Sequence, residues 1–242
     1  MTLEGRNVVL EALRAKREIK KILIDGGATG KGKIDEILSL AKDGAVPVIT
    51  KGRRELDDVS VTFSHQGVIA FAPKGEEITL TRLLKRLEGE SPFLVVLGEV
   101  MYEQNLGAIL RTSECAGVDG IIVPKRRSAP MSATVSRVSM GASEYVPVIR
   151  EGAASALSVI RSEGIMVFGV DAKGDLPYFE ADLTGASAFV FGGEDKGLSE
   201  MVRKKCDVVI SIPLIGRISS LNVSVSVGIV LYEKVRQQQK SR

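Results

Sequence analysis

Short apolar runs alternate with amphipathic segments along almost the whole chain. Runs rich in Val, Ile and Phe, such as residues 93–100 (FLVVLGEV) and 165–172 (IMVFGVDA), predict strands, because β-branched and aromatic side chains favour extended structure. The segments between such runs place apolar residues three or four positions apart, which is typical of helices packed on one face. Strands that are apolar throughout are typical of parallel sheets covered on both sides. The pattern therefore predicts an α/β fold with parallel sheets.

A change in composition predicts two domains. The polar stretch PKGEE at 73–77 separates the first set of strands and helices from the rest, and Pro92 closes the amphipathic segment that follows it. We expect a small α/β domain over residues 1–72, a connector over 73–92 and a larger domain over 93–242.

Composition narrows the class of protein. The chain has 242 residues, of which 44% are hydrophobic and 26% are charged, as in ordinary soluble domains. No apolar run approaches the roughly 20 residues that cross a bilayer, and the first 20 residues lack the apolar core of a signal peptide. Two cysteines, Cys115 and Cys206, are too few for a disulfide framework, so we expect both in the core of a cytoplasmic protein. The net charge of +3 is compatible with RNA binding without being diagnostic of it.

The glycine-rich turn at 192–198 favours a ligand without phosphates. No segment has the spacing of a phosphate-binding loop or of a dinucleotide fingerprint. Gly192, Gly193 and Gly197 follow an apolar strand, but Glu194 lies among them, where a carboxylate would repel phosphate. A tight turn with an acidic helix cap is the alternative. The single histidine, His65, is expected at a surface or turn, so proton transfer would fall to carboxylate, hydroxyl or guanidinium groups.

The segment 217–233 (RISSLNVSVSVGIVLYE) places four serines and an asparagine in an otherwise apolar run. A buried hydroxyl or amide without a partner costs about 1–3 kcal/mol, so these groups need a reason. The local alternation in VSVSV by itself predicts a strand.

Three motifs in the larger domain resemble those of the SpoU family of RNA ribose 2′-O-methyltransferases, within the SPOUT superfamily. The family patterns are N-x-G-A-x-x-R, G-x-E-x-x-G-L and I-P-M-x-G-x-x-x-S-L-N-V-S. They match here at residues 105–111, 192–198 and 212–224, in the family order and spacing, with Leu214 in place of Met. Each motif alone is weak, and the set of three is highly specific.

The resemblance extends over nearly the whole chain. The segments GRNVVLEAL, QGVIA and VPKRRSAPMSATVSRVSMGASEYVPV are most similar to the branch that methylates guanosine in 23S rRNA. In that branch the small N-terminal domain is similar to ribosomal protein L30e and binds RNA. The segment 98–105 (GEVMYEQN) lacks the acidic-Pro-Gln residues common before Asn105, which bears on the choice of RNA.

The resemblance implies a trefoil-knotted methyltransferase domain built on a parallel sheet, a bound S-adenosylmethionine and a homodimer packed through the knotted regions. It turns the strand expected over VSVSV into a helix that begins near Ser220, with Ser219 or Ser220 as N-cap. In that helix the residues at i, i+4, i+7 and i+8 form an apolar stripe, namely Val223, Val227, Val230 and Leu231.

The resemblance also assigns the site residues, and no metal is expected among them. Arg111 contacts the reacting ribose hydroxyl, and because guanidinium stays protonated we expect it to stabilise the alkoxide. Glu194 is the expected proton acceptor; the alternatives are that it positions Arg111 or the ribose, or that Arg111 itself acts as the base, as proposed for the family. The residues that orient ribose and cofactor are Asn105, Ser220 and Asn222. The cofactor-binding positions, mainly through the backbone, are Gly192, Gly193, Gly197, Ile212 and Leu221.

Three functions stay open on the sequence. The leading one is 2′-O-methylation of a guanosine in 23S rRNA. A tRNA ribose 2′-O-methyltransferase would carry the same motifs. A non-catalytic rRNA-binding assembly factor would use only the small domain, and the intact motif residues argue against it.

Overall fold

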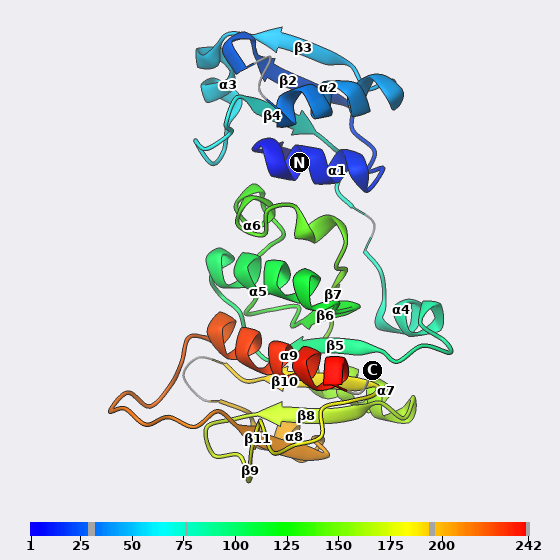
Figure 1. Cartoon of the computed structure of the whole chain (residues 1–242), viewed down its shortest axis with the longest axis vertical. Coiled ribbons are helices and arrows are strands. Elements are labelled where there is room, and N and C mark those ends of the chain that lie inside the picture. The colour runs from blue at the N-terminus through cyan, green and yellow to red at the C-terminus, as the bar shows by residue number, and fades with distance from the viewer. Residues whose placement is uncertain (29–31, 76, 194–196, 241–242) are drawn as a thin grey trace. The chain divides into compact units, whose positions relative to one another are not determined.

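The computed structural model describes residues 1–28, 32–75, 77–193 and 197–240. Glu194, the expected proton acceptor, lies outside the described residues. The chain divides into two compact units, Met1–Glu76 with Pro130–Tyr145, and Glu77–Ala129 with Val146–Arg242 (Figure 1). None of the described helices is long and apolar enough to cross a membrane.

The first unit is built on a mixed sheet with the strand order β1-β4-β2-β3. β2 and β3 are parallel, whereas β4 is antiparallel to both β1 and β2, so the prediction of parallel sheets is wrong for this unit. An apolar run shows that a strand is buried but not its direction, which the connections decide. The elements are β1 (Thr2–Glu4), α1 (Arg6–Arg14), β2 (Lys21–Asp25), η1 (Gly26–Ala28), α2 (Lys33–Asp43), β3 (Val48–Lys51), α3 (Arg53–Val59) and β4 (Val68–Phe71).

A segment from the middle of the chain completes the first unit. α6 (Ala133–Val138) packs on β1 and α1, and η2 (Ala142–Glu144) packs on α1. Arg17 Nη1 lies 2.5 Å from Glu144 Oε1, and both side chains are largely buried. Burial raises the pKa of the Glu144 carboxyl, against the opposing effect of Arg17. Gly141 has φ +92°, and a Cβ there would lie 2.7 Å from Glu11 Cβ, so this contact requires glycine.

A fully buried carboxylate organises the loop between α3 and β4. Glu4 accepts hydrogen bonds from Ser60 Oγ and Val61 N, both at 2.7 Å, and from the amide and hydroxyl of Thr62. Burial works to raise the pKa of the Glu4 carboxyl, but these donors outweigh it and the net pKa is lowered. His65 lies in the same loop and is buried, contrary to a surface position; its Nδ1 accepts a hydrogen bond from Gly67 N at 3.1 Å.

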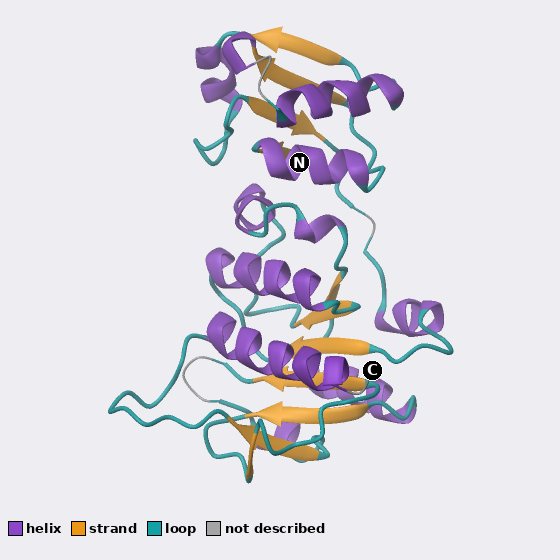
Figure 2. Cartoon of the chain, viewed as in Figure 1, coloured by secondary structure: helices purple, strands orange, loops and turns teal. Residues whose placement is uncertain are grey.

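The second unit is built on a seven-stranded sheet with the order β7-β6-β5-β10-β8-β11-β9 (Figure 2). Every neighbouring pair in it is parallel, which confirms the prediction for this unit. The strands are β5 (Phe93–Leu97), β6 (Gly120–Val123), β7 (Val148–Arg150), β8 (Met166–Val170), β9 (Leu176–Pro177), β10 (Ser187–Phe191) and β11 (Val208–Ser211).

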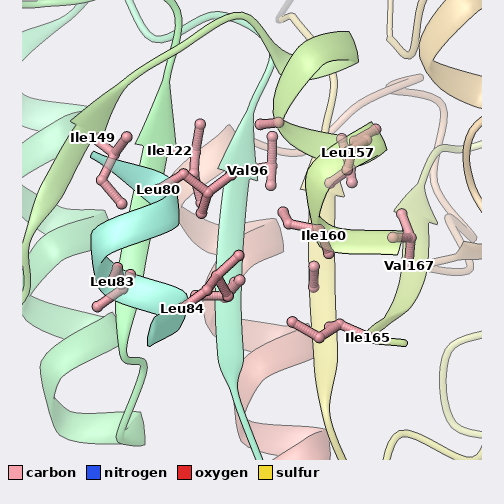
Figure 3. Packing of buried hydrophobic residues seen from close by; sticks show 14 of the residues in the cluster. Leu80, Leu83, Leu84, Val96, Ile122, Ile149, Leu157, Ile160, Ile165 and Val167 are labelled. Atoms are coloured by element: carbon pink, nitrogen blue, oxygen red, sulfur yellow. The ribbon is translucent and has the colours of Figure 1, made fainter. Parts of the chain in front are cut away.

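Helices cover both faces of this sheet. α4 (Leu80–Arg86), α7 (Ala153–Ser162) and α8 (Glu200–Arg203) lie on one face, where their apolar side chains meet those of the strands (Figure 3). α5 (Glu103–Ala116) and α9 (Val223–Lys240) pack against each other on the opposite face. Cys115 lies near the end of α5 and is exposed, and Cys206 is half-buried, so the expectation of two core cysteines is wrong for Cys115. Apolar composition alone does not tell on which side of a helix a small residue falls.

The predicted apolar stripe of α9 is confirmed, because Val223, Val227, Val230 and Leu231 are all buried. The helix begins at Val223, and Asn222 rather than Ser219 or Ser220 caps it. Asn222 Oδ1 accepts a hydrogen bond from Ser224 N at 2.9 Å, which is the usual N-cap bond.

α9 also carries a fully buried lysine. Lys234 Nζ donates to the carbonyl oxygens of Leu183 at 2.9 Å and Gly185 at 2.6 Å, and lies 5.0 Å from the centre of the Phe93 ring. Burial lowers the pKa of Lys234 to about 8, despite the raising effects of Asp182 and Asp119. A neutral amine still has two N–H groups, enough for both carbonyls.

The lowered pKa of Lys234 makes stability depend on pH. Above pH 8 Lys234 is largely deprotonated in the folded chain, whereas in the unfolded chain it keeps its proton until about pH 10.5. Because the unfolded state binds more protons in this window, the free energy of unfolding rises with pH. Relative to Lys234→Met, the wild-type free energy of unfolding should rise by about 2 kcal/mol between pH 8 and pH 10. Urea unfolding at each pH measures it. The exposed Lys204→Met variant is the matched control and should follow the wild type; parallel curves for wild type and Lys234→Met would contradict the burial argument.

Candidate active site

A cavity of about 480 Å³ opens in the second unit at the carboxyl ends of β8, β10 and β11. In parallel sheets these ends lie at one edge, where open α/β sheets bind their ligands. Val170 closes β8, Phe191 closes β10, and Ile212 follows β11; all three line the cavity. The strand order alone therefore brings segments from distant parts of the sequence to one place.

The three glycines after β10 all line this cavity. Gly193 N donates to Gly197 O at 3.2 Å, and Gly197 N donates to Gly193 O at 3.1 Å. A Cβ on Gly192 would lie 2.0 Å from the carbonyl carbon of Gly197, so a side chain cannot fit between the two backbones. The sequence thus needs glycine here because two stretches of main chain touch.

Asp171, the residue after β8, braces the same turn. Its Oδ2 accepts a hydrogen bond from Leu198 N at 3.0 Å, and its Oδ1 accepts one from Lys173 N at 2.9 Å. A Cβ on Gly197 would lie 2.6 Å from Asp171 Oδ2. The sequence analysis missed Asp171, although an acidic residue directly after an apolar strand was the available signal.

Two cations also line the cavity and were missed. Lys173 follows Asp171, and Arg203 lies at the end of α8. The Arg203 guanidinium donates to the carbonyl oxygen of Lys173 at 3.0 Å and lies 3.6 Å from Asp175 Oδ2. None of the three motifs contains these residues, so only the fold brings them to the cavity wall.

The segment between β11 and α9 forms another wall. Ser219, Ser220 and Leu221 line the cavity together with Ile212, and the two serines are exposed. All five expected cofactor-binding residues therefore line one cavity, and Ser220 is the one expected catalytic residue among the described ones that does so.

Asn105 and Asn222 meet although 117 residues separate them. Asn222 Nδ2 donates to Asn105 Oδ1 at 3.1 Å, which joins the first turn of α5 to the start of α9. Asn222 Oδ1 also accepts hydrogen bonds from the amide and the hydroxyl of Ser224. The Asn222 amide is thus largely occupied by protein contacts, which join the starts of the two helices.

Arg111 lies on α5 about 9 Å further along the axis than Asn105. It is exposed, and within the described part of the chain its guanidinium has no ion pair or hydrogen bond. Arg111 lies on the same helix as Asn105 but does not line the cavity. A guanidinium left open in this way is able to bind an anionic group.

Comparison with known proteins places both units in one family. Residues 92–232 match the model of the SpoU rRNA methylase family, and residues 2–77 match that of the RNA 2′-O ribose methyltransferase substrate-binding domain. A member of the TrmH family of tRNA/rRNA methyltransferases from Bacillus subtilis is 36% identical over 97% of this chain and 94% of its own.

Two solved structures are similar to this chain, one over its whole length and one over part of it. The SpoU methyltransferase AviRb from Streptomyces viridochromogenes, crystallised with the cofactor AdoMet, has a TM-score of 0.80 and 25% identity over 100% of this chain and 91% of its own. A TrmH/SpoU tRNA modifying enzyme from A. aeolicus has a TM-score of 0.56 and 26% identity over 66% of this chain and 85% of its own. With its two domain matches and a relative that spans it almost end to end, this chain belongs to the SpoU methylase family of RNA 2′-O-ribose methyltransferases.

Proposed function

We propose that this protein uses S-adenosylmethionine to methylate the 2′-hydroxyl of a guanosine ribose in 23S rRNA, in the cytoplasm. The observation that carries the proposal is the cavity in which Gly192, Gly193, Gly197, Ile212 and Leu221 come together. These residues come from two motifs that are distant in sequence, and a common cavity is what a shared ligand requires.

The cavity suits S-adenosylmethionine, the cofactor present in the AviRb crystals. Its volume of about 480 Å³ is within the usual range for small-molecule sites. Gly192, Gly193 and Gly197 line the cavity and have no side chains, so a planar adenine ring can approach their main chain closely. The cofactor supplies a methyl group on a positively charged sulfur, and the protein has to supply orientation and proton transfer.

The ribose hydroxyl is a very weak acid, so the side chains near it have two tasks. Arg111, which keeps its charge, stabilises the developing alkoxide and holds the neighbouring phosphate. Glu194 accepts the proton. Ser220 lies at the cavity wall and orients the ribose. The hydrogen bond between Asn105 and Asn222 fixes the starts of α5 and α9 relative to each other.

The substrate-binding domain favours a large structured RNA as the substrate. The tRNA modifying enzyme from A. aeolicus aligns with 66% of this chain while covering 85% of its own, so the similarity leaves about a third of this chain unmatched. The AviRb structure matches the whole chain, and residues 2–77 match a substrate-binding domain. A large structured RNA that needs a second contact domain accounts for the extra length.

A homodimer with a knotted C-terminal region completes the proposal. Apolar side chains are exposed on and before α9, among them Ile215, Ile218, Val225 and Tyr232, and a second copy would cover them. The match of residues 92–232 to the SpoU rRNA methylase family, whose motifs imply the knot, is what supports a threaded chain. When the two ends of the unfolded chain are pulled apart, the fully stretched length of a knotted chain should be shorter than that of an unknotted chain of 242 residues.

The RNA target is tested with purified protein and tritiated S-adenosylmethionine. Methyl transfer to 23S rRNA should exceed transfer to 16S rRNA and to total tRNA. The rRNA of a deletion strain should lack 2′-O-methylation at one guanosine, and the protein should restore it in vitro. Transfer to tRNA alone would replace the rRNA assignment, and cofactor binding without transfer to any RNA would reject the enzyme.

Arg111→Ala should lower kcat by about 100- to 1,000-fold, because an uncompensated alkoxide raises the barrier. Cofactor affinity by calorimetry should stay at the wild-type value, since Arg111 does not line the cavity. Glu194→Gln is the companion variant, with a lower rate and loss of the acidic limb of the pH–rate profile. Near-normal turnover of Arg111→Ala would remove its role, and an unchanged pH profile of Glu194→Gln would exclude Glu194 as the base.

The dimer is tested by light scattering at micromolar concentration. We expect twice the 25.9 kDa chain mass, and a shift toward monomer for Val225→Glu combined with Tyr232→Glu, since charges would replace the exposed apolar side chains of α9. A wild-type monomer at this concentration would contradict the proposal.

A further inference from the structure

The residue before α5 does not cap this helix. Tyr102 occupies the N-cap position with φ −96° and ψ 128°, and its side chain makes no capping hydrogen bond. Ser, Thr, Asp and Asn are the residues that stabilise a helix start from this position. Tyr102 is instead 60% exposed, and its neighbour Met101 is 55% exposed. An exposed aromatic ring at this point does not serve the stability of α5.

A basic loop is paired with the segment that leads into Tyr102. Val100 N donates to Arg127 O at 3.1 Å, and Ala129 N donates to Val100 O at 2.7 Å, so the loops after β5 and β6 are paired through their backbones. The Arg150 guanidinium donates to Ser128 Oγ at 2.9 Å and to Ala129 O at 3.0 Å. The loop is therefore held in place by its main chain and by Arg150.

The charged side chains of this loop are left to solvent. Lys125, Arg126 and Arg127 are all exposed, and none of them has an ion pair with any residue that the structure describes. Arg127 has φ +62°, a conformation that non-glycine residues rarely adopt. Three unpaired cations on an anchored loop form a site of concentrated positive charge.

We propose that Met101, Tyr102 and Lys125–Arg127 form a contact surface for the unpaired RNA strand that carries the target ribose. A base stacks on the Tyr102 ring, and the three cations hold the phosphates on either side of it. Single-stranded RNA is bound in this way, by an aromatic platform within a positively charged groove. Asn105 lies three residues after Tyr102, within one helical turn, so the surface borders the site of methyl transfer. The inference rests on the proposed function and adds to it the residues that select the strand.

The test compares variants of the full-length protein on the RNA that the wild type methylates. Tyr102→Ala should raise the KM for RNA and its Kd by about 5- to 100-fold, because a stacked base is lost. Tyr102→Phe should keep the wild-type values. Arg126→Ala and Arg127→Ala should each weaken binding and make the slope of log K against log[salt] shallower by about 0.7. kcat at saturating RNA, cofactor affinity and dimer mass should not change.

Two matched controls lie elsewhere in the same unit. Phe179→Ala removes a ring that is 50% exposed, and Lys204→Ala removes an exposed cation. Neither should change RNA affinity or the salt slope. Wild-type RNA affinity in Tyr102→Ala, or equal losses in the controls, would overturn the inference and leave the proposed function intact. A change of oligomeric mass in Tyr102→Ala would also overturn it, because the ring would then belong to a subunit contact. Failure of the wild type to bind or methylate any RNA would reject the proposed function, and the contact surface with it.

Discussion

The contact between two stretches of main chain at Gly192 is the constraint on which the site depends. β10 lies between β5 and β8, and the turn after it folds back until Gly192 meets the backbone of Gly197. Asp171 then ties the far side of this turn to the end of β8 through Leu198 N. A side chain at Gly192 would clash with the main chain of Gly197 and Leu198, both of which line the cavity. The cavity is thus a consequence of strand order and of glycine at one position.

The binding surface and the chemistry are divided between backbone and side chains. Glycines and small polar residues of two motifs, among them Gly192, Gly193 and Ser220, line the cavity beside charged residues that belong to no motif. The reactive side chains expected from the family lie on the helix starts and helix faces nearby, as Asn105 and Arg111 do on α5. Asn222 connects the two parts, since one amide both caps α9 and binds Asn105. The serines and the asparagine of the last motif are therefore explained without burying them unpaired.

Much of this arrangement could be predicted from the sequence, and the failures have physical reasons. Periodicity and the family motifs together gave the parallel sheet of the second unit and the buried stripe of α9, because both depend on local pattern. The antiparallel direction of β4 could not be predicted, since strand direction follows from the connections. Asp171 was missed because its role lies in a hydrogen bond to a residue 27 positions away. The surface position expected for His65 was wrong, because the loop that Glu4 organises buries its ring.

The start of α5 illustrates how function accounts for a departure from local rules. An aspartate or serine in place of Tyr102 would add a capping bond worth about 1 kcal/mol, and nothing in the fold prevents it. The same turn is held instead by the paired backbones of Val100 and Ala129, which is enough to fix the direction of the helix. Position 102 makes no capping hydrogen bond, so it can carry the exposed aromatic ring that the proposed RNA contact requires. Such a residue is exposed and adds little to stability. Its substitution can therefore change which substrate binds without destabilising the fold.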